Sequence, residues 1–431
     1  MLEVLDGRTQ ATPVHIPRPR PVEGHSKADE DVAAIVEDVR LRGDAAIFDR
    51  QGRIPAPGSL RVPEELIGRA TAQVGPGFID ALEVMEERLR RTCERQVEET
   101  WLEWRADDLV GELVRPLRRV GVYVPGGRYA RPSGIVMAVV PAQVAGVEGI
   151  AIAASPGDDG EIPEPLLAVC AVLGLTEVYR VGGAGAIAAL AHGTESVRPV
   201  EKIVGPDDAQ VRSAKRLVRG WVGVDADIGS AELAIVADGN ASPGILAADL
   251  IAQAEHGPNG AHVLITWEPD VADQVISSLD LQVAIHERSD DVENALIEGG
   301  RAVLVRDLDH ALDTANAFAP QHLQLHIDNA VDALDRVRNA GSISVGPFSA
   351  VPAGDYVGGT NHLLPSGGAA RWSSGLSVRD FIKRTYVTGL ERSALERLAP
   401  HVDALAETEG LHGHARAVHL RLDPSAADEP E

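Results

Sequence analysis

The stretch Val120-Gly121-Val122-Tyr123-Val124-Pro125-Gly126-Gly127 is a short apolar run that ends in a proline–glycine turn, and it opens an α/β pattern. Similar apolar strands are predicted at residues 149–154, 177–181 and 202–205, with an alanine-rich helical segment at 184–191 among them. Strands that alternate with helices predict a parallel sheet that is covered by helices on its faces. The fold class is therefore α/β.

The same alternation resumes after a loop at residues 225–229. Further strands are predicted at 232–237, 262–267, 302–305 and 342–345, and helices near 244–255 and 312–318. Two α/β units are thus expected in one chain, which agrees with a length of 431 residues.

The flanking regions have a different character. Residues 1–25 are rich in proline and basic side chains and predict an extended N-terminal arm, and helices are predicted from Ser26 to Gly43 and from about 79 to 104. From Leu376 the chain is predicted to be helical, with a last strand at 419–422 and an acidic tail at 423–431.

The composition indicates which binding partners and which cellular compartment are expected. The formal net charge of −25 disfavours nucleic acid and anionic membranes, because both would repel such a surface. The chain has 2 cysteines and shows neither a signal-peptide pattern nor an apolar run of the roughly 20 residues that span a membrane. We therefore expect a cytoplasmic protein without a disulfide framework.

Several residues are of the kind that binds metals or moves protons. Gln253 and His256 are three positions apart at a predicted helix end, so they project from one face, where they form either a metal site or a helix-end hydrogen bond. A glycine-rich loop at 354–362 carries Asp355 and His362, and its alternative is a long turn with a capping aspartate. His322 lies at a predicted helix-to-strand junction and His414 in a predicted turn. Each of them is either a functional residue or a histidine with a purely structural role.

Taken together and in this order, these motifs resemble histidinol dehydrogenase. The resemblance spans nearly the whole chain, and its specific strings are Tyr123–Gly127, Val181–Ala184, Gly193–Glu195, Gln253–Pro258, Gly354–Tyr356 and Gly359–His362. It implies two incomplete Rossmann-like parallel-sheet domains, a helical N-terminal region and an extended C-terminal tail, in a domain-swapped homodimer with shared active sites. On this basis residues 26–122 with 232–375 are assigned to the first domain, 123–231 to the second, and 376–431 to a helical tail that completes the partner's site.

The resemblance also implies roles for particular residues. The resemblance implies four zinc ligands: Gln253, His256, Asp355 and, from the partner subunit, His414. One anionic ligand among four leaves a net positive site, which is suited to polarising an oxygen. His322 corresponds to the proton-accepting histidine. The residues implied to contact the substrate or NAD are His322, His362, Glu409, Asp355, Ser230, Tyr123, Gly185 and Asp208.

Three departures from the family pattern bear on function. Gln321 stands where the family has a catalytic glutamate, and an amide cannot accept a proton at neutral pH. Gly185 replaces a glutamine, and Asp207-Asp208 replaces Gly-Asn, which would put two carboxylates near a dinucleotide diphosphate. Ala231 replaces a substrate-side serine, with Ser230 beside it as a substitute.

The expected function is a zinc-dependent, NAD-linked oxidation of a small polar alcohol, with amino alcohols among the candidates, that stops at the carbonyl and does not convert histidinol to histidine. The alternative is a redox-neutral zinc enzyme (lyase, cyclase, hydrolase or epimerase) that no longer uses NAD. A non-catalytic descendant, and a histidinol dehydrogenase with a relocated base, are further hypotheses.

Overall fold

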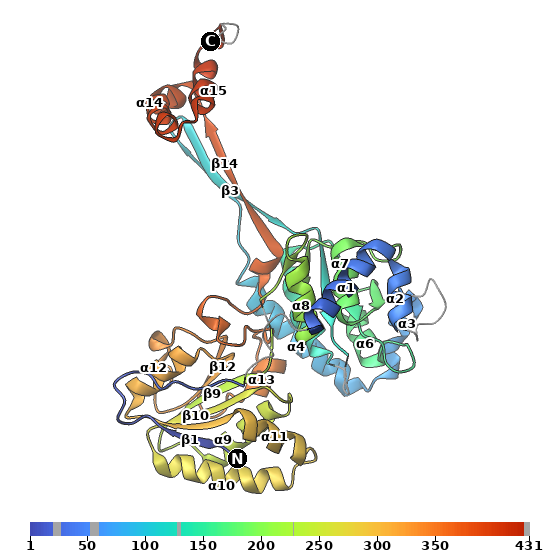
Figure 1. The fold of residues 1–431 in the computed structure, drawn as a ribbon, viewed down its shortest axis with the longest axis vertical. Coiled ribbons are helices and arrows are strands. Elements are labelled where there is room, and N and C mark those ends of the chain that lie inside the picture. The colour runs from blue at the N-terminus through green and yellow to red at the C-terminus, as the bar shows by residue number, and fades with distance from the viewer. Residues whose placement is uncertain (20–26, 52–59, 127–130, 227, 426–431) are drawn as a thin grey trace. The chain divides into compact units, whose positions relative to one another are not determined.

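The computed structural model describes residues 1–19, 27–51, 60–126, 131–226 and 228–425. The chain divides into two compact units, a larger one of residues 1–96 and 117–381 and a smaller one of residues 97–116 and 382–431 (Figure 1). Parts of the predicted arm, the loop at 225–229 and the acidic tail lie outside the described residues.

The larger unit holds two parallel sheets, and the first of them has five strands in the order β6-β5-β4-β7-β8. Its strands are β4 (Arg119–Val124), β5 (Gly149–Ala154), β6 (Val178–Arg180), β7 (Lys202–Val204) and β8 (Gly223–Val224). The connecting helices are α5 (Ser133–Ala145), α6 (Glu164–Val172), α7 (Gly183–His192) and α8 (Ala209–Val218). The predicted strands and the alanine-rich helix of this region are confirmed.

Helices from the N-terminal region also cover this five-stranded sheet. They are α1 (Lys27–Arg42), α2 (Asp44–Gln51), α3 (Glu64–Ala70), the 3-10 helix η1 (Thr71–Gln73) and α4 (Pro76–Glu94). Val32, Val36 and Val39 of α1 are buried against α7, and Leu82, Met85 and Leu89 of α4 belong to the core on the other face. The structure thus differs from the assignment of residues 26–122 to the other domain, because the apolar faces of these helices pack on the five-stranded sheet.

The second sheet of the larger unit has six parallel strands in the order β1-β11-β10-β9-β12-β13. They are β1 (Glu3–Asp6), β9 (Glu232–Ala237), β10 (Ala261–Thr266), β11 (Gly300–Leu304), β12 (His322–His326) and β13 (Ser342–Val345). The strands predicted here are confirmed. Within the predicted extended N-terminal arm, residues 3–6 form β1, which pairs with β11 along the edge of the sheet.

Helices cover both faces of the six-stranded sheet. One face carries α9 (Pro243–Ala254), α10 (Pro269–Ala284) and α11 (Ser289–Gly299), and the other carries α12 (Leu308–Phe318). Shorter helices follow: η2 (Leu334–Arg336), α13 (Val351–Tyr356), η3 (Ala369–Arg371) and η4 (Val378–Phe381). Each sheet of the larger unit therefore lies between two helical layers, as in Rossmann-like folds.

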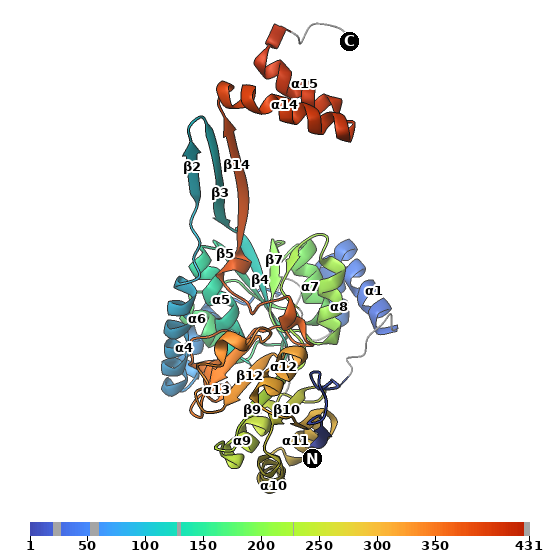
Figure 2. The ribbon, with the colours of Figure 1, turned by 90° about the vertical axis from the view of Figure 1, so that its left-hand side faces the viewer.

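The smaller unit is an antiparallel sheet followed by two helices (Figure 2). Strands β2 (Trp101–Arg105), β3 (Asp108–Pro116) and β14 (Ile382–Leu390) pair in the order β14-β3-β2, and α14 (Arg392–Glu409) precedes α15 (His412–Leu422). Three predictions are wrong here. The chain was expected to be helical from Leu376, but residues 382–390 form the strand β14, which pairs with β3. The helix expected up to residue 104 ends at Glu94, and the strand expected at 419–422 is part of α15, which packs on α14 after the left-handed turn at Gly410.

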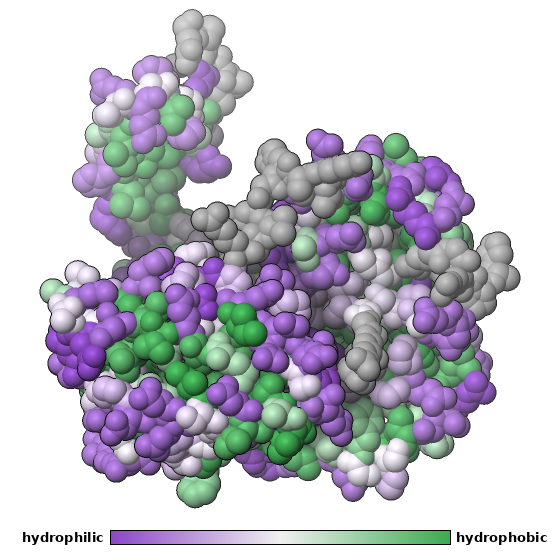
Figure 3. All heavy atoms as spheres, turned by 60° about the horizontal axis from the view of Figure 1, so that its bottom comes forward, coloured by the Kyte–Doolittle hydropathy of each residue, from purple (hydrophilic) through white to green (hydrophobic). Residues whose placement is uncertain are grey.

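Across the described part of the chain, no helix is both long enough and apolar enough to cross a membrane. Cys93 and Cys170 are buried free thiols. The face of the molecule in Figure 3 mixes hydrophilic side chains with separate hydrophobic areas.

Candidate active site

A cavity of about 1510 Å³ in the larger unit is lined by loops that meet the ends of both parallel sheets. In the five-stranded sheet its walls follow the carboxyl ends of the neighbouring strands β4 and β7, from which the chain continues in opposite directions across the sheet. Such a switch point is the usual ligand site of an open α/β sheet. In the six-stranded sheet, by contrast, residues 229–231 and 321–322 lie at the amino ends of β9 and β12.

Most of the residues singled out from the sequence line this one cavity. They are Tyr123, Asp208, Ser230, Gln253, His256, Gln321, His322, Asp355 and His362. Gly185 is not among the lining residues. Glu409 and His414 belong to the smaller unit, at the end of α14 and in the first turn of α15, so their roles stay predictions.

Gln253 and His256 are placed by the end of α9. Gln253 lies in the last turn of this helix and is 3% exposed, and within the described residues its side-chain amide forms no hydrogen bond. His256 follows the C-cap Glu255 and is exposed toward the cavity. Desolvation, aided by the positive charge of Arg131, lowers the pKa of His256 to about 4. The imidazole is therefore neutral and has a lone pair available for a ligand.

Asp355 and His322 face each other across a short gap. The Nε2 atom of His322 lies 3.9 Å from Oδ1 of Asp355, which is too long for a hydrogen bond. Desolvation raises the pKa of Asp355 to about 7, and burial lowers the pKa of His322 to about 3. Burial thus favours the neutral form of each group.

His362 has a defined ring orientation. Its Nδ1 atom lies 2.8 Å from the main-chain oxygen of Asp355. A carbonyl oxygen only accepts hydrogen bonds, so Nδ1 carries the proton and Nε2 of the neutral ring keeps its lone pair. His362 can therefore accept a hydrogen bond through Nε2.

These side chains fit a divalent cation that prefers nitrogen and oxygen ligands. Gln253 supplies an amide oxygen that has no hydrogen bond within the described residues, His256 supplies a neutral imidazole, and Asp355 supplies a carboxylate whose pKa is raised by burial. The described residues contain no cluster of three or more His, Cys, Asp or Glu side chains with metal-binding geometry. This result agrees with a metal site in which one ligand is the Gln253 amide and a further ligand comes from outside this cavity wall.

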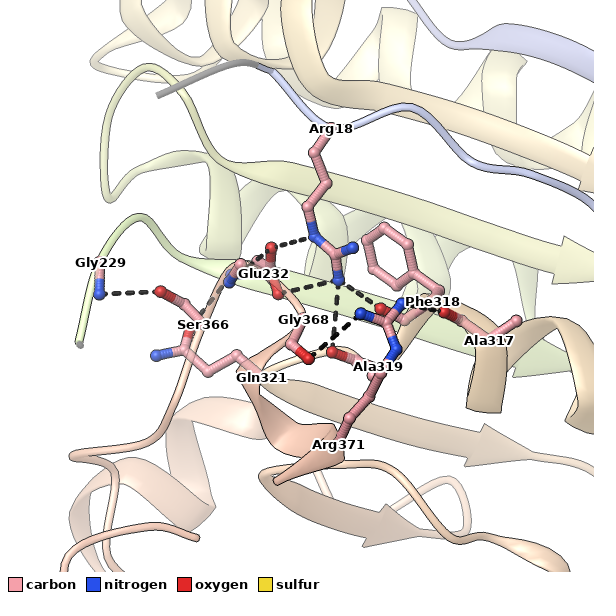
Figure 4. A network of polar contacts seen from close by, with 11 residues as sticks. Arg18, Gly229, Glu232, Ala317, Phe318, Ala319, Gln321, Ser366, Gly368 and Arg371 are labelled. Carbon is pink, nitrogen blue, oxygen red and sulfur yellow. Dashed lines mark hydrogen bonds and ion pairs between the residues drawn. The ribbon is translucent and has the colours of Figure 1, made fainter. Parts of the chain in front are cut away.

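Gln321 is part of a buried polar network (Figure 4). Its Oε1 atom accepts the main-chain N–H of Glu232 at 3.0 Å, and its Nε2 donates to the oxygen of Leu364 at 3.4 Å. The carboxylate of Glu232 is paired with Arg18, whose Nε lies 2.5 Å from Oε1, and also accepts the N–H of Gly367. The Gln321 amide therefore fixes the starts of β9 and β12 relative to the loop that follows His362.

Arg18 completes this network from the N-terminal arm. Its Nη2 atom donates to the main-chain oxygens of Phe318 and Ala319, and its guanidinium lies 3.9 Å from the centre of the Phe318 ring. The arm is thus tied to the end of α12, directly before Gln321.

The two aspartates that were expected to repel a diphosphate are both engaged within the protein. Asp207 and Asp225 each lie 2.6 Å from Nζ of the buried Lys215. Asp208 caps α8, where its Oδ1 accepts the N–H of Val211 at 2.8 Å. Gly205 precedes this turn at φ +128°, and a Cβ there would overlap the main chain of Tyr123. Neither carboxylate is a free charge in the cavity.

Tyr123 has a role in the scaffold as well as a place in the cavity wall. Its hydroxyl accepts the N–H of Gly183 at 3.3 Å, which holds the start of α7 against β4. A side chain at Gly185, in the first turn of α7, would find open space. The glycine therefore leaves this position without a side chain and without a contact to the surroundings.

Sequence reasoning missed three polar residues of this region. Arg131 and Arg212 line the cavity as cations, and Ser342 contacts His322 from β13. Ser342 is the partner of His322 in the strand register, a relation that no local motif reveals. For a single arginine in a loop or on a helix, the sequence does not indicate whether its side chain points into a cavity or into solvent.

One cavity at the switch point of a parallel sheet gathers neutral imidazoles together with a carboxylate and an amide that form no side-chain hydrogen bond within the described residues. This arrangement is typical of the active site of an α/β enzyme. The family model of histidinol dehydrogenase matches residues 18–422. This chain belongs to the histidinol dehydrogenase family, whose members are oxidoreductases.

Individual relatives show the extent of the similarity. A histidinol dehydrogenase from Moorella thermoacetica is 41% identical over 430 residues, which cover 98% of this chain and 100% of the relative. One from Methanothermobacter thermautotrophicus is 42% identical, with 91% and 92% covered. The crystal structure of histidinol dehydrogenase from Elizabethkingia anophelis has a TM-score of 0.89 at 30% identity and covers 95% of each chain.

These relatives correct the functional expectation drawn from Gln321 and the altered cofactor residues. We expected an alcohol other than histidinol or a redox-neutral reaction. Both expectations are wrong, because full-length relatives at about 40% identity are histidinol dehydrogenases. The reasoning gave single substitutions too much weight. Asp207 and Asp208 are neutralised or used within the scaffold, and Gln321 keeps a structural contact that does not need a carboxylate.

Proposed function

We propose that this protein is an NAD-linked, zinc-dependent histidinol dehydrogenase that oxidises histidinol through the aldehyde to histidine. The observation that carries the proposal is the cavity in which His322 faces Asp355 at 3.9 Å, beside His256 and Gln253. The full-length relatives named above support the choice of substrate.

The metal would be held by Gln253, His256, Asp355 and His414 of the partner subunit. When bound, zinc supplies a positive charge that polarises the oxygen of the substrate. The support for these ligands is the chemistry of the three side chains in the cavity wall, which have lone pairs and form no side-chain hydrogen bond within the described residues.

His322 is the proton acceptor in this proposal. Its burial keeps the ring neutral, and its Nε2 faces the site. Gln321 cannot take a proton, so His322 accepts the alcohol proton and also assists attack of water on the aldehyde.

The proposed substrate contacts are made by side chains that have a free lone pair or that are exposed toward the cavity. His362 can accept a hydrogen bond from the ammonium or imidazole N–H of histidinol through Nε2, because its Nδ1 is engaged by the Asp355 carbonyl. Ser230 is exposed toward the cavity and offers a hydroxyl next to Ala231. NAD would lie along the side of the cavity formed by Tyr123 and Asp208, and Glu409 would reach the substrate from the partner subunit.

Partner contributions are supported by the surface of the smaller unit. Within the described residues α15 buries no side chain, and α14 buries only Ala394, Ala399 and Ala406. Large apolar side chains are exposed instead, and Figure 3 shows a hydrophobic area on this unit at the upper left. They are Trp101, Leu102, Trp104, Tyr386, Leu398, Leu405 and Leu411. So much exposed apolar surface on a unit without a core favours burial against a second copy of the chain.

The proposal is tested by assaying the purified, zinc-loaded protein with histidinol and NAD⁺, and with histidinal in separate reactions. We expect NADH from both substrates and histidine as the product. As a control, His322→Gln should abolish both reactions while zinc content and fold are retained. Absence of histidine formation by the wild-type protein would refute the proposal.

A further inference from the structure

His322 and Ser342 begin two neighbouring strands and face each other. His322 is the first residue of β12, Ser342 is the first residue of β13, and the parallel register pairs the two. The Oγ atom of Ser342 lies 2.9 Å from Nδ1 of His322, which is hydrogen-bonding distance. The ring is thus held at Nδ1, and its other nitrogen, Nε2, lies on the side of Asp355.

A second cavity, of about 260 Å³, lies on the Ser342 side of the ring. His322 and Asp355 line both this cavity and the main one, so they form part of the wall between the two. The second cavity is also lined by the polar residues Ser344, Thr360 and Asn361. The hydroxyl of Ser342 therefore has polar space beside it, into which its own proton can be directed.

The position of the single proton on the neutral ring decides whether His322 can act as a base. With the proton on Nε2, that nitrogen cannot accept another proton. With the proton on Nδ1, the Nε2 lone pair is free, and Nδ1–H needs an acceptor. Within the described residues, the Ser342 hydroxyl is the group at hydrogen-bonding distance from Nδ1.

We propose that Ser342 is a positioning residue whose Oγ accepts a hydrogen bond from Nδ1–H of His322 and thereby presents the Nε2 lone pair to the substrate. The inference rests on the proposed function, in which His322 accepts the alcohol proton. In that step the substrate O–H bond breaks, an Nε2–H bond forms, and the ring becomes an imidazolium. Ser342 accepts from Nδ1–H before and after the transfer, so the ring does not have to turn.

Three variants test the role through kinetics. Ser342→Ala removes the acceptor, Ser342→Thr keeps a hydroxyl, and Ser344→Ala is a matched control two residues along the same strand and at the same cavity. We expect Ser342→Ala to lower kcat about ten-fold or more, the order of one lost hydrogen bond, with KM for histidinol and zinc content nearly unchanged. Ser342→Thr should restore most of kcat, and Ser344→Ala should resemble wild type. An unchanged kcat in Ser342→Ala would overturn the proposal.

The protonated nitrogen can also be observed without turnover. Two-bond nitrogen–proton NMR of the labelled, zinc-loaded protein distinguishes Nδ1–H from Nε2–H rings, and His322→Gln assigns the signal. We expect the Nδ1–H form in wild type and its loss in Ser342→Ala. An Nε2–H form in wild type would overturn the role of Ser342, whatever the kinetics of the threonine variant. Because this readout needs no histidinol, failure of the proposed function would be seen separately, in the activity assay.

Discussion

The Nζ atom of Lys215 lies 2.6 Å from Oδ1 of Asp207, in the interior beneath the turn that follows β7. Asp225 contacts the same ammonium at 2.6 Å, so the cluster buries two carboxylates with one cation. As a consequence, the side chain of Asp207 is 1% exposed, and its negative charge is paired with the Lys215 ammonium. This contact explains how a carboxylate is tolerated in the wall of the main cavity.

Stability should depend on pH through Asp207. Burial raises the pKa of Asp207 to about 7 from an ordinary value of 3.8, so the folded state binds this proton more tightly than the unfolded state. The stabilisation is complete below about pH 4 and is lost as the pH rises toward 7. We expect Asp207→Asn to gain stability over wild type across that range, by about 1 kcal/mol or more, because Lys215 keeps Asp225. Urea unfolding at several pH values measures the difference.

Asp208→Asn is the control for this prediction, because it removes the neighbouring negative charge from the exposed N-cap of α8, where asparagine also caps well. A stability difference between Asp207→Asn and wild type that stays constant from pH 4 to pH 7 would contradict the assignment.

The Arg18–Glu232 pair should stabilise the site as a unit. Glu232 is 4% exposed, and removing one partner leaves a buried charge without compensation. Arg18→Ala should therefore lower the free energy of unfolding by about 3 kcal/mol. The double variant Arg18→Ala/Glu232→Gln should lose less than the sum of the two single variants. Additive losses in chemical denaturation would show that the ion pair contributes no coupling.

Gln321→Glu should alter the two oxidations differently. A carboxylate at this position still accepts the Glu232 N–H, and it adds a group that can take a proton from water. Oxidation of histidinal should become about ten-fold faster or more, while oxidation of histidinol should change little. Single-turnover measurements with each substrate separate the two steps. A slower aldehyde step in the variant would argue that the amide itself is needed.

The proposal that each active site is built from two subunits can be tested by subunit mixing. His414→Ala should weaken zinc binding at the partner's site, and His322→Gln inactivates its own site. Each homodimer should be inactive. Unfolding the mixture and refolding it should restore about a quarter of wild-type activity, because half of the dimers are mixed and each has one intact site. No recovered activity, with mixed dimers demonstrated by mass spectrometry, would contradict a site built from two subunits.

Much of the larger unit could be predicted from the sequence, because its strands are continuous apolar runs separated by glycine turns and alanine-rich helices. Residues 232–237 and 342–345 are strands with the predicted bounds. The pattern could not tell which sheet α1 and α4 cover, since an apolar helix face fits either. Residues 101–105 and 419–422 were misassigned, because exposed strands and helices of the smaller unit lack the periodicity that a core imposes.

For the site, the sequence identified the side chains of the cavity wall but not their electrostatic partners. Gln253, His256 and Asp355 belong to recognisable strings, whereas Lys215 and Ser342 act through contacts between distant strands and helices. The expectation that Asp207 repels a diphosphate failed for this reason. Whether a charge is compensated depends on the three-dimensional neighbours, and no local motif records them.

The most direct measurement is the stoichiometry of the complete reaction with limiting histidinol and excess NAD⁺. Oxidation of an alcohol to a carboxylate removes four electrons, and each NAD⁺ accepts two, so the account predicts about two NADH and one histidine for each histidinol consumed. No NADH from histidinol, or one NADH with accumulation of the aldehyde, would contradict it.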